Sequence, residues 1–234
     1  MSVSKKRSGE KEYTPLAERM RPLSLDKFYG QEHLIGKGKI LSQLIKSDHL
    51  VSIIFWGPPG SGKTTLGYIL AKYFDLPCIF FSAVVSGIKE VKEVMSKAES
   101  HKKFYKQPTI IFIDEIHRFN KAQQGAFLPY VERGDIILYG STTENPSFEV
   151  IAPLLSRMKV LILNPLEKET LVKIMIEALN DKDKGLGNLS LKVKEAVLEL
   201  IIDHSNGDAR RSLNTLEIAA NFAENNQITE EGVK

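Results

Sequence analysis

The chain has 234 residues, of which 42% are hydrophobic and 26% are charged, and its formal net charge is +3. These values predict a globular protein with one large domain or two small ones. A single cysteine, Cys78, excludes an internal disulfide framework and a cysteine-rich zinc site. No apolar run approaches the roughly 18 residues of a membrane helix, and no signal peptide opens the chain. We therefore expect a protein without a membrane partner, cytoplasmic or, if eukaryotic, nuclear.

An apolar run at 51–56 leads into a glycine-rich segment and then into a helical pattern. The segment reads Gly-Pro-Pro-Gly-Ser-Gly-Lys-Thr from Gly57 to Thr64. Its glycines let successive N–H groups turn toward a β-phosphate, and the following helix adds its positive dipole end. We expect Lys63 to reach the β- and γ-phosphates of a nucleoside triphosphate and Thr64 to hold Mg²⁺. The predicted nucleotide-binding loop consists of Gly57, Pro58, Pro59, Gly60, Ser61, Gly62, Lys63, Thr64 and Thr65.

A second apolar run, 109–113, ends in Asp114 and Glu115. Its β-branched and aromatic residues are typical of a buried strand. At the carboxyl end of that strand, Asp114 is placed to hold Mg²⁺ through its water shell. Glu115 points elsewhere and can polarise a water for attack on the γ-phosphate. The pair predicts hydrolysis of the nucleotide rather than phosphoryl transfer to a small acceptor; the alternative interpretation is a solvated strand end.

Strands and helices alternate as far as about residue 163. We predict strands at 51–56, 77–82, 109–115, 135–141 and 159–163, with helices between them that include 87–101, 121–131 and 152–157. This pattern predicts an α/β fold, a P-loop module with a mainly parallel five-stranded sheet and helices on both faces.

After Pro165 only helices are predicted, at about 167–180, 191–204 and 208–224. A boundary is therefore expected near 164–165, between a nucleotide-binding domain at 14–164 and a small all-helical lid at 165–234. Residues 1–13 are largely polar and charged, which is typical of a disordered tail. Residues 228–234 have an N-cap residue and an acidic first turn, the start of another helix, so we expect the chain to be a fragment.

The order of these motifs resembles an AAA+ ATPase of the clamp-loader group. The resemblance is closest to the family of replication-associated recombination protein A (RarA, also called MgsA), whose eukaryotic relative is the Werner helicase-interacting ATPase. It covers about residues 14–230 and is carried by the segments 15–22, 30–34, 117–121, 142–148 and 207–211. The family has a C-terminal oligomerisation region that we do not find in this sequence.

The resemblance implies that the nucleotide is ATP, and it implies roles for single residues. Thr143, or Asn145 as the alternative, would orient the attacking water as sensor 1. Arg157 would be an arginine finger that serves a neighbouring subunit, and Arg210 would be sensor 2. The alternative for each arginine is a surface ion pair. The adenine site would be walled by Arg21, Tyr29 and Gly30.

The resemblance also implies a homo-oligomer with DNA in its central channel. Lys89, Arg118 and Lys121 are expected there, since lysines and helix N-termini can track phosphates. A basic and aromatic cluster at 97–106 fits a solvated helix end better than a DNA site. The implied activity is a DNA-stimulated ATPase at stalled forks or gaps, with partners such as single-strand binding protein. The alternative is an ATP-gated interaction module whose slow hydrolysis acts as a timer.

Overall fold

The computed structural model describes residues 13–83 and 87–233. The predicted disordered tail lies outside the described residues except for Tyr13, whose hydroxyl donates a hydrogen bond to Glu217 at 2.9 Å. None of the helices described is both long and apolar enough to span a bilayer.

Five parallel strands form the central sheet in the order β2-β3-β4-β1-β5. The strands are β1 (Ser52–Trp56), β2 (Cys78–Ser82), β3 (Thr109–Asp114), β4 (Ile136–Thr142) and β5 (Met158–Ile162). Each lies within one or two residues of its predicted bounds, because short apolar runs bounded by glycine, proline or charge mark buried strands clearly. The predicted α/β class and five-stranded parallel sheet are confirmed.

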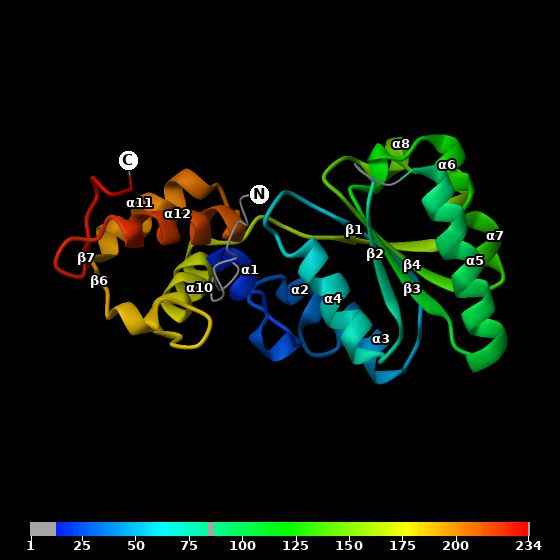
Figure 1. Ribbon diagram of the computed structural model, residues 1–234, viewed down its shortest axis with the longest axis horizontal. Helices are drawn as coiled ribbons and strands as arrows, with labels where there is room; N and C mark the ends of the chain where they lie inside the picture. The colour runs from blue at the N-terminus through cyan, green and yellow to red at the C-terminus, as the bar shows by residue number, and fades with distance from the viewer. Residues whose placement is uncertain (1–12, 84–86, 234) are drawn as a thin grey trace, which may run out of the picture.

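Helices cover both faces of the sheet, which Figure 1 shows on the right. They are α2 (Glu32–Ile35), α3 (Ile40–Lys46), α4 (Lys63–Tyr73), α5 (Ile88–Tyr105), α6 (Lys121–Gly125), α7 (Leu128–Glu132), α8 (Pro146–Glu149) and α9 (Ala152–Leu155). Successive strand residues point to opposite faces. Ile54 and Ile111 accordingly pack in a cluster with α5. Ile53, Phe55 and Ile110 pack in another cluster with α3 and α4.

A third hydrophobic cluster lies in the left part of Figure 1, where the C-terminal helices meet α1. The elements are α1 (Leu16–Arg19), α10 (Lys168–Asn180), α11 (Glu195–Ser205) and α12 (Ala209–Asn221), with the short strands β6 (Lys192–Val193) and β7 (Gln227–Ile228). Leu16 is fully buried in this cluster. The predicted division placed residue 16 with the nucleotide-binding domain, but its packing partners are the C-terminal helices. The N-terminal segment therefore crosses between the two parts of the molecule.

Three predicted helices differ from the structure. The helix expected over 121–131 is divided into α6 and α7, because Gly125 ends the first and Pro129 fits the first turn of the second. The helix expected from 191 begins at Glu195, since the preceding residues pair in parallel with β7. The helix opening expected over 228–234 is also wrong within the described residues, where β7 is followed by turns. The C-terminal part therefore contains a small strand pair besides its helices.

Glu217 of α12 holds the N-terminal segment against the C-terminal helices. Its carboxylate accepts hydrogen bonds from the backbone N–H of Leu16 at 2.9 Å and from Arg19 at 2.8 Å, besides that from Tyr13. Burial raises the pKa of this carboxyl, but the hydrogen bonds and the charge of Arg19 outweigh it, so the pKa is lowered. The ionised Glu217 therefore stabilises the fold at pH values above the ordinary glutamate pKa. This stabilisation is lost as the pH falls through the lowered pKa.

We expect Glu217→Gln to lower the free energy of unfolding at pH 7 by about 1–3 kcal/mol, since a buried charged acceptor is lost. Urea unfolding followed by circular dichroism measures this. Glu199→Gln, an exposed change on α11, is the matched control. The difference between wild type and Glu217→Gln should shrink below about pH 4; a difference independent of pH would contradict the ionic contribution.

Candidate functional site

The glycine-rich loop connects β1 to the first residue of α4, Lys63. Gly60 and Gly62 have φ angles of 66° and 101°, in the left-handed region that favours glycine. A Cβ atom on Gly60 would lie 1.8 Å from a carboxylate oxygen of Asp208, and one on Gly62 would lie 2.6 Å from the ring of Phe28. Close approach and backbone conformation therefore both require glycine here.

The Lys63 side chain folds back into the loop. Its Nζ donates to the carbonyl oxygens of Gly57 and Pro58, both at 2.9 Å. Only 7% of the residue is exposed, and burial lowers the pKa of the amine. The ammonium group is thus held at the start of α4, where the helix dipole also favours an anion.

The first carboxylate of the acid pair lies beside the loop. Asp114 Oδ1 accepts a hydrogen bond from Thr64 Oγ1 at 3.4 Å and one from Ser141 Oγ at 2.5 Å. These are hard oxygen ligands, the type that Mg²⁺ prefers. Asp114 and Ser141 come from two neighbouring strand ends, and Thr64 comes from the first turn of α4. The residues present therefore fit a magnesium ion between Thr64 and Asp114.

The second carboxylate, that of Glu115, contacts a different neighbour, His117. Glu115 follows β3 with φ 55° and ψ 51°, a left-handed conformation that is uncommon for residues other than glycine. Its Oε2 lies 3.2 Å from Nδ1 of His117, which in turn lies 3.0 Å from Oγ1 of Thr142. The chain of contacts connects Glu115 to the end of β4.

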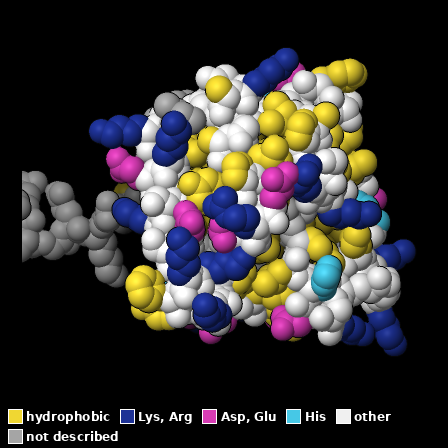
Figure 2. All heavy atoms as spheres, turned by 90° about the vertical axis from the view of Figure 1, so that its right-hand side faces the viewer, with side chains coloured by type: hydrophobic (Ala, Val, Ile, Leu, Met, Phe, Trp, Pro, Cys, Tyr) yellow, Lys and Arg dark blue, Asp and Glu magenta, His cyan; other side chains and the backbone are white. Residues whose placement is uncertain are grey.

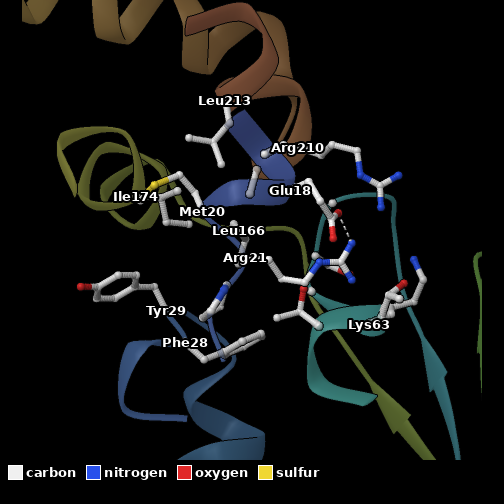
Figure 3. Close-up of a pocket in the computed structure, with 18 of the residues that line it drawn as sticks. Glu18, Met20, Arg21, Phe28, Tyr29, Lys63, Leu166, Ile174, Arg210 and Leu213 are labelled. Carbon is white, nitrogen blue, oxygen red and sulfur yellow. Dashed lines mark hydrogen bonds and ion pairs between the residues drawn. The ribbon is translucent and has the colours of Figure 1, made fainter. Parts of the chain in front are cut away.

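A cavity of about 330 Å³ runs from this acid pair to an apolar end. Lys63, Asp114 and Glu115 lie at one end, and Phe28, Tyr29, Ile174 and others form the rest of the wall. Figure 3 shows that the lining side chains come from the glycine-rich loop, from the N-terminal segment and from the C-terminal helices. The cavity is thus suited to an elongated ligand with an anionic end and an apolar ring.

The structure brings most of the predicted nucleotide-binding residues into this cavity. Its wall includes Arg21, Tyr29, Pro59, Gly60, Ser61, Gly62, Lys63, Thr64, Thr65 and Arg210. Gly57 and Pro58 contribute through the carbonyl groups that hold Lys63. Gly30 is buried behind the wall, where a Cβ atom would lie 2.7 Å from Leu166.

Three of the predicted catalytic residues do not line the cavity. Thr143 follows the end of β4, and the side chain of Asn145 caps α8 by accepting from the N–H of Ser147 at 3.0 Å. Arg157 pairs with Glu132 of α7 at 2.6 Å, and 41% of its side chain is exposed. Arg157 is therefore outside the cavity of its own chain.

The predicted DNA residues are exposed and lie at the carboxyl end of the sheet. Lys89 is in the first turn of α5, Arg118 is in the turn after β3, and Lys121 begins α6. In the basic and aromatic cluster at 97–106, by contrast, two lysines form ion pairs within the protein. Lys102 pairs with Asp135 at 3.5 Å and Lys103 with Glu99 at 3.0 Å.

Sequence reasoning missed Ser141 and Thr142 and gave His117 no role beyond its place in a motif. Ser141 contacts Asp114 because β3 and β4 pair in parallel with Ile113 opposite Gly140, which sets the next residues side by side. The sequence signal that could have found Ser141 is a polar residue near the end of a predicted strand. Which strand lies next to β3, however, follows only from the order of strands in the sheet.

The fold and the cavity together define an AAA module. A family model of the ATPase family associated with various cellular activities (AAA) matches residues 53–166. Replication-associated recombination protein A of Haemophilus influenzae is 45% identical over 225 residues, which are 96% of this chain and 50% of that protein. ATPase WRNIP1 of Dictyostelium discoideum is 44% identical over 210 residues, 90% of this chain and 24% of that protein. The solved structure of the RuvB Holliday junction branch migration motor of Thermotoga maritima aligns with a TM-score of 0.73 and 25% identity, covering 92% of this chain and 71% of that one.

The chain therefore belongs to the AAA family and, within it, to the family of replication-associated recombination protein A. It spans about half the length of two replication-associated recombination protein A relatives, 50% and 48% of them, and 24% of the WRNIP1 relative.

Proposed function

We propose that the cavity binds ATP with Mg²⁺ and that the protein hydrolyses it. The observation that carries the proposal is the meeting of Lys63, Thr64 and Asp114 at one end of a cavity with an apolar far end. Thr64 and Asp114 would hold the Mg²⁺, which would supply positive charge against the charge that develops on the phosphates. Lys63 leaves its loop carbonyls for the β- and γ-phosphates, and the apolar wall near Tyr29 takes the adenine.

Glu115 is the residue we assign to the attacking water. Its carboxylate lies in the cavity wall next to Asp114, and His117 holds one of its oxygens. A carboxylate so oriented can polarise a water in line with the γ-phosphate. Thr143 or Asn145, in the loop after β4, is assigned to the other side of that water; the cap that Asn145 makes for α8 leaves only its amide nitrogen for this role, which favours Thr143.

Two arginines complete the proposed site, one from the same chain and one from a neighbouring copy. Arg210 at the start of α12 reaches the cavity from the C-terminal helices, in keeping with sensor 2. Arg157 lies outside the cavity and is assigned to the site of a neighbouring copy, which makes the active form a homo-oligomer with head-to-tail interfaces. Its ion pair with Glu132 is exposed and therefore weak enough to exchange for a phosphate.

The family supplies the biological setting. Its curated members are named for replication-associated recombination, and the structurally similar RuvB is named as a branch migration motor. We accordingly assign this protein to DNA at stalled forks or gaps, in the bacterial cytoplasm or a nucleus, with replication proteins such as single-strand binding protein as partners. The second candidate, an ATP-gated module that only times docking to another protein, is favoured by Phe148 of α8, an aromatic side chain that is 84% exposed.

Steady-state ATP turnover with and without single-stranded and forked DNA separates the two candidates. A DNA-acting ATPase is stimulated by DNA and displaces a strand. A timer hydrolyses ATP at one slow rate regardless of DNA, and that result would contradict the assignment to DNA.

Contacts to DNA are assigned to Lys89, Arg118 and Lys121. Figure 2 shows the face formed around α5 to α8, where Lys and Arg side chains are spread among acidic and apolar ones. The three residues lie on elements that follow β2 and β3 and so share the carboxyl edge of the sheet. Such contacts neutralise phosphates and release counterions without reading sequence.

We expect the triple change of Lys89, Arg118 and Lys121 to Ala to weaken single-stranded DNA binding for all sequences alike. The slope of log affinity against log salt should flatten by about 2 when three phosphate contacts on a single strand are lost. Fluorescence anisotropy across a salt series measures both. The matched control changes Lys173, Lys182 and Lys192, three exposed lysines of the C-terminal part, to Ala. Equal losses in both triples would mean that net charge alone is responsible.

A further inference from the structure

Arg21 lies between the two parts of the molecule. It follows α1, which packs with the C-terminal helices, and its guanidinium stands 5.0 Å from the ring centroid of Tyr68 on α4. The residue lines the cavity together with Lys63 and Thr64. Figure 3 shows its side chain inside the cavity, below Glu18 and on the side that leads to Lys63.

The hydrogen bonding of this guanidinium is incomplete. Nη2 donates to Glu18 Oε2 at 2.5 Å. Nη1 is buried and has no hydrogen-bond partner within the part of the chain that the structure describes. A guanidinium carries five N–H donors, and a buried donor without an acceptor is unfavourable. Among the described residues, Arg21 therefore gives the cavity a cationic group with a buried N–H donor, Nη1, that lacks an acceptor.

Its present partner is weakly held. The Glu18 side chain is 54% exposed, whereas that of Arg21 is 19% exposed. Ion pairs that involve a solvated carboxylate contribute little, so a better acceptor can displace Glu18. Phosphate is such an acceptor, because the planar fork of a guanidinium matches its oxygens in geometry and charge.

We propose that Arg21 is a phosphate-binding residue of this cavity, held by Glu18 while the cavity is empty and transferred to a phosphate of the nucleotide when it binds. The inference deepens the proposed nucleotide binding and rests on it. It assigns Arg21 a contact with phosphate rather than with the adenine ring. Glu18 lies on α1, which packs with the C-terminal helices. The loss of its ion pair with Arg21 would therefore couple nucleotide binding to that part of the molecule.

Calorimetric titration of the whole protein with ADP tests the proposal in four forms: wild type, Arg21→Gln, Glu18→Gln and the double variant. Arg21→Gln should weaken ADP binding about tenfold or more, because a charge-assisted hydrogen bond is lost. Glu18→Gln should tighten it by about two- to fivefold, because the competing acceptor is weakened. In the Arg21→Gln background, Glu18→Gln should change nothing.

The double variant separates exchange from simple repulsion. If Glu18 only repels the phosphates, its substitution tightens ADP binding equally with and without Arg21, which would overturn the exchange. Arg133→Gln, a change at an exposed arginine of another ion pair, is the control, and thermal unfolding shows that each variant is folded.

Inorganic tripolyphosphate, which has the phosphates of ATP without base or sugar, distinguishes the two kinds of contact. Its displacement of a fluorescent ADP should weaken by the same factor in Arg21→Gln. Unchanged tripolyphosphate binding, or unchanged ADP binding, overturns the inference. Wild-type protein that binds no nucleotide would overturn the proposed function as well, whereas loss of the Arg21 effect alone overturns only this step.

Discussion

We expect that mixing the Arg157→Ala and Glu115→Gln variants, in the proposed oligomeric form of the protein, will restore ATP turnover that neither variant has alone. Arg157→Ala is expected to lose about 10³-fold or more in turnover, since an arginine finger contributes a factor of about 10³–10⁵. Glu115→Gln is expected to block turnover, because the attacking water is no longer polarised. In a mixed oligomer, a site with its own Glu115 can face a neighbour that still presents Arg157. For an equal mixture this holds at about a quarter of the interfaces of a head-to-tail ring.

Phosphate release from the mixed protein measures the rescue, after subunit exchange has been demonstrated. The structure motivates the experiment, because Arg157 lies outside the cavity of its own chain and is paired with the exposed Glu132. Glu132→Gln is a control that removes the pair and leaves both assigned groups intact. Mixtures that remain inactive despite exchange would show that Arg157 acts within its own subunit or has only a structural role.

We expect Lys63→Ala to abolish detectable ATP binding, whereas Glu115→Gln should keep binding and block turnover. Lys63 meets the phosphates in the ground state, and the loss of its charge-assisted hydrogen bonds costs about 3 kcal/mol or more, roughly a hundredfold in affinity. Glu115 acts on the water in the transition state, so its substitution lowers the rate and not the affinity.

Equilibrium titration with a fluorescent ATP analogue measures binding, and phosphate release measures turnover. Lys63→Ala also leaves the carbonyl oxygens of Gly57 and Pro58 without their donor, so its unfolding temperature must be compared with that of wild type. Lys72→Ala, on the exposed side of the same helix, is the matched control. Equal loss of affinity in Lys63→Ala and Glu115→Gln would refute this division of roles.

The parts of the candidate site that can be predicted from the sequence are motifs whose residues are consecutive in the chain. The loop from Gly57 to Thr64 and the acid pair at the end of β3 are short motifs, each next to an apolar run that identifies its strand. Their approach follows from one rule, that parallel strands carry ligands at their carboxyl ends. The side chains of Thr64 and Asp114 accordingly lie 3.4 Å apart, while their predicted role in holding Mg²⁺ remains a prediction.

The remaining features depend on contacts between distant residues. Ser141 meets Asp114 through the register of β3 and β4, and Leu16 packs with α12 about two hundred residues away. No local pattern reveals either pairing. The same holds for the strand pair β6 and β7, which replaces the first turn of a predicted helix. Short sequence motifs thus predict the candidate functional groups. The order and register of the strands determine which polar side chains, such as Ser141, form hydrogen bonds with them.

The structure of the protein with Mg²⁺ and a non-hydrolysable ATP analogue tests the central claim most directly. We predict the triphosphate within hydrogen-bond distance of the N–H groups of the loop 60–64 and of Lys63 Nζ. The metal ion should lie between Thr64 and Asp114, and the base against Tyr29 and Ile174. A cavity that stays empty at saturating nucleotide, or an analogue bound elsewhere on the chain, would contradict the account.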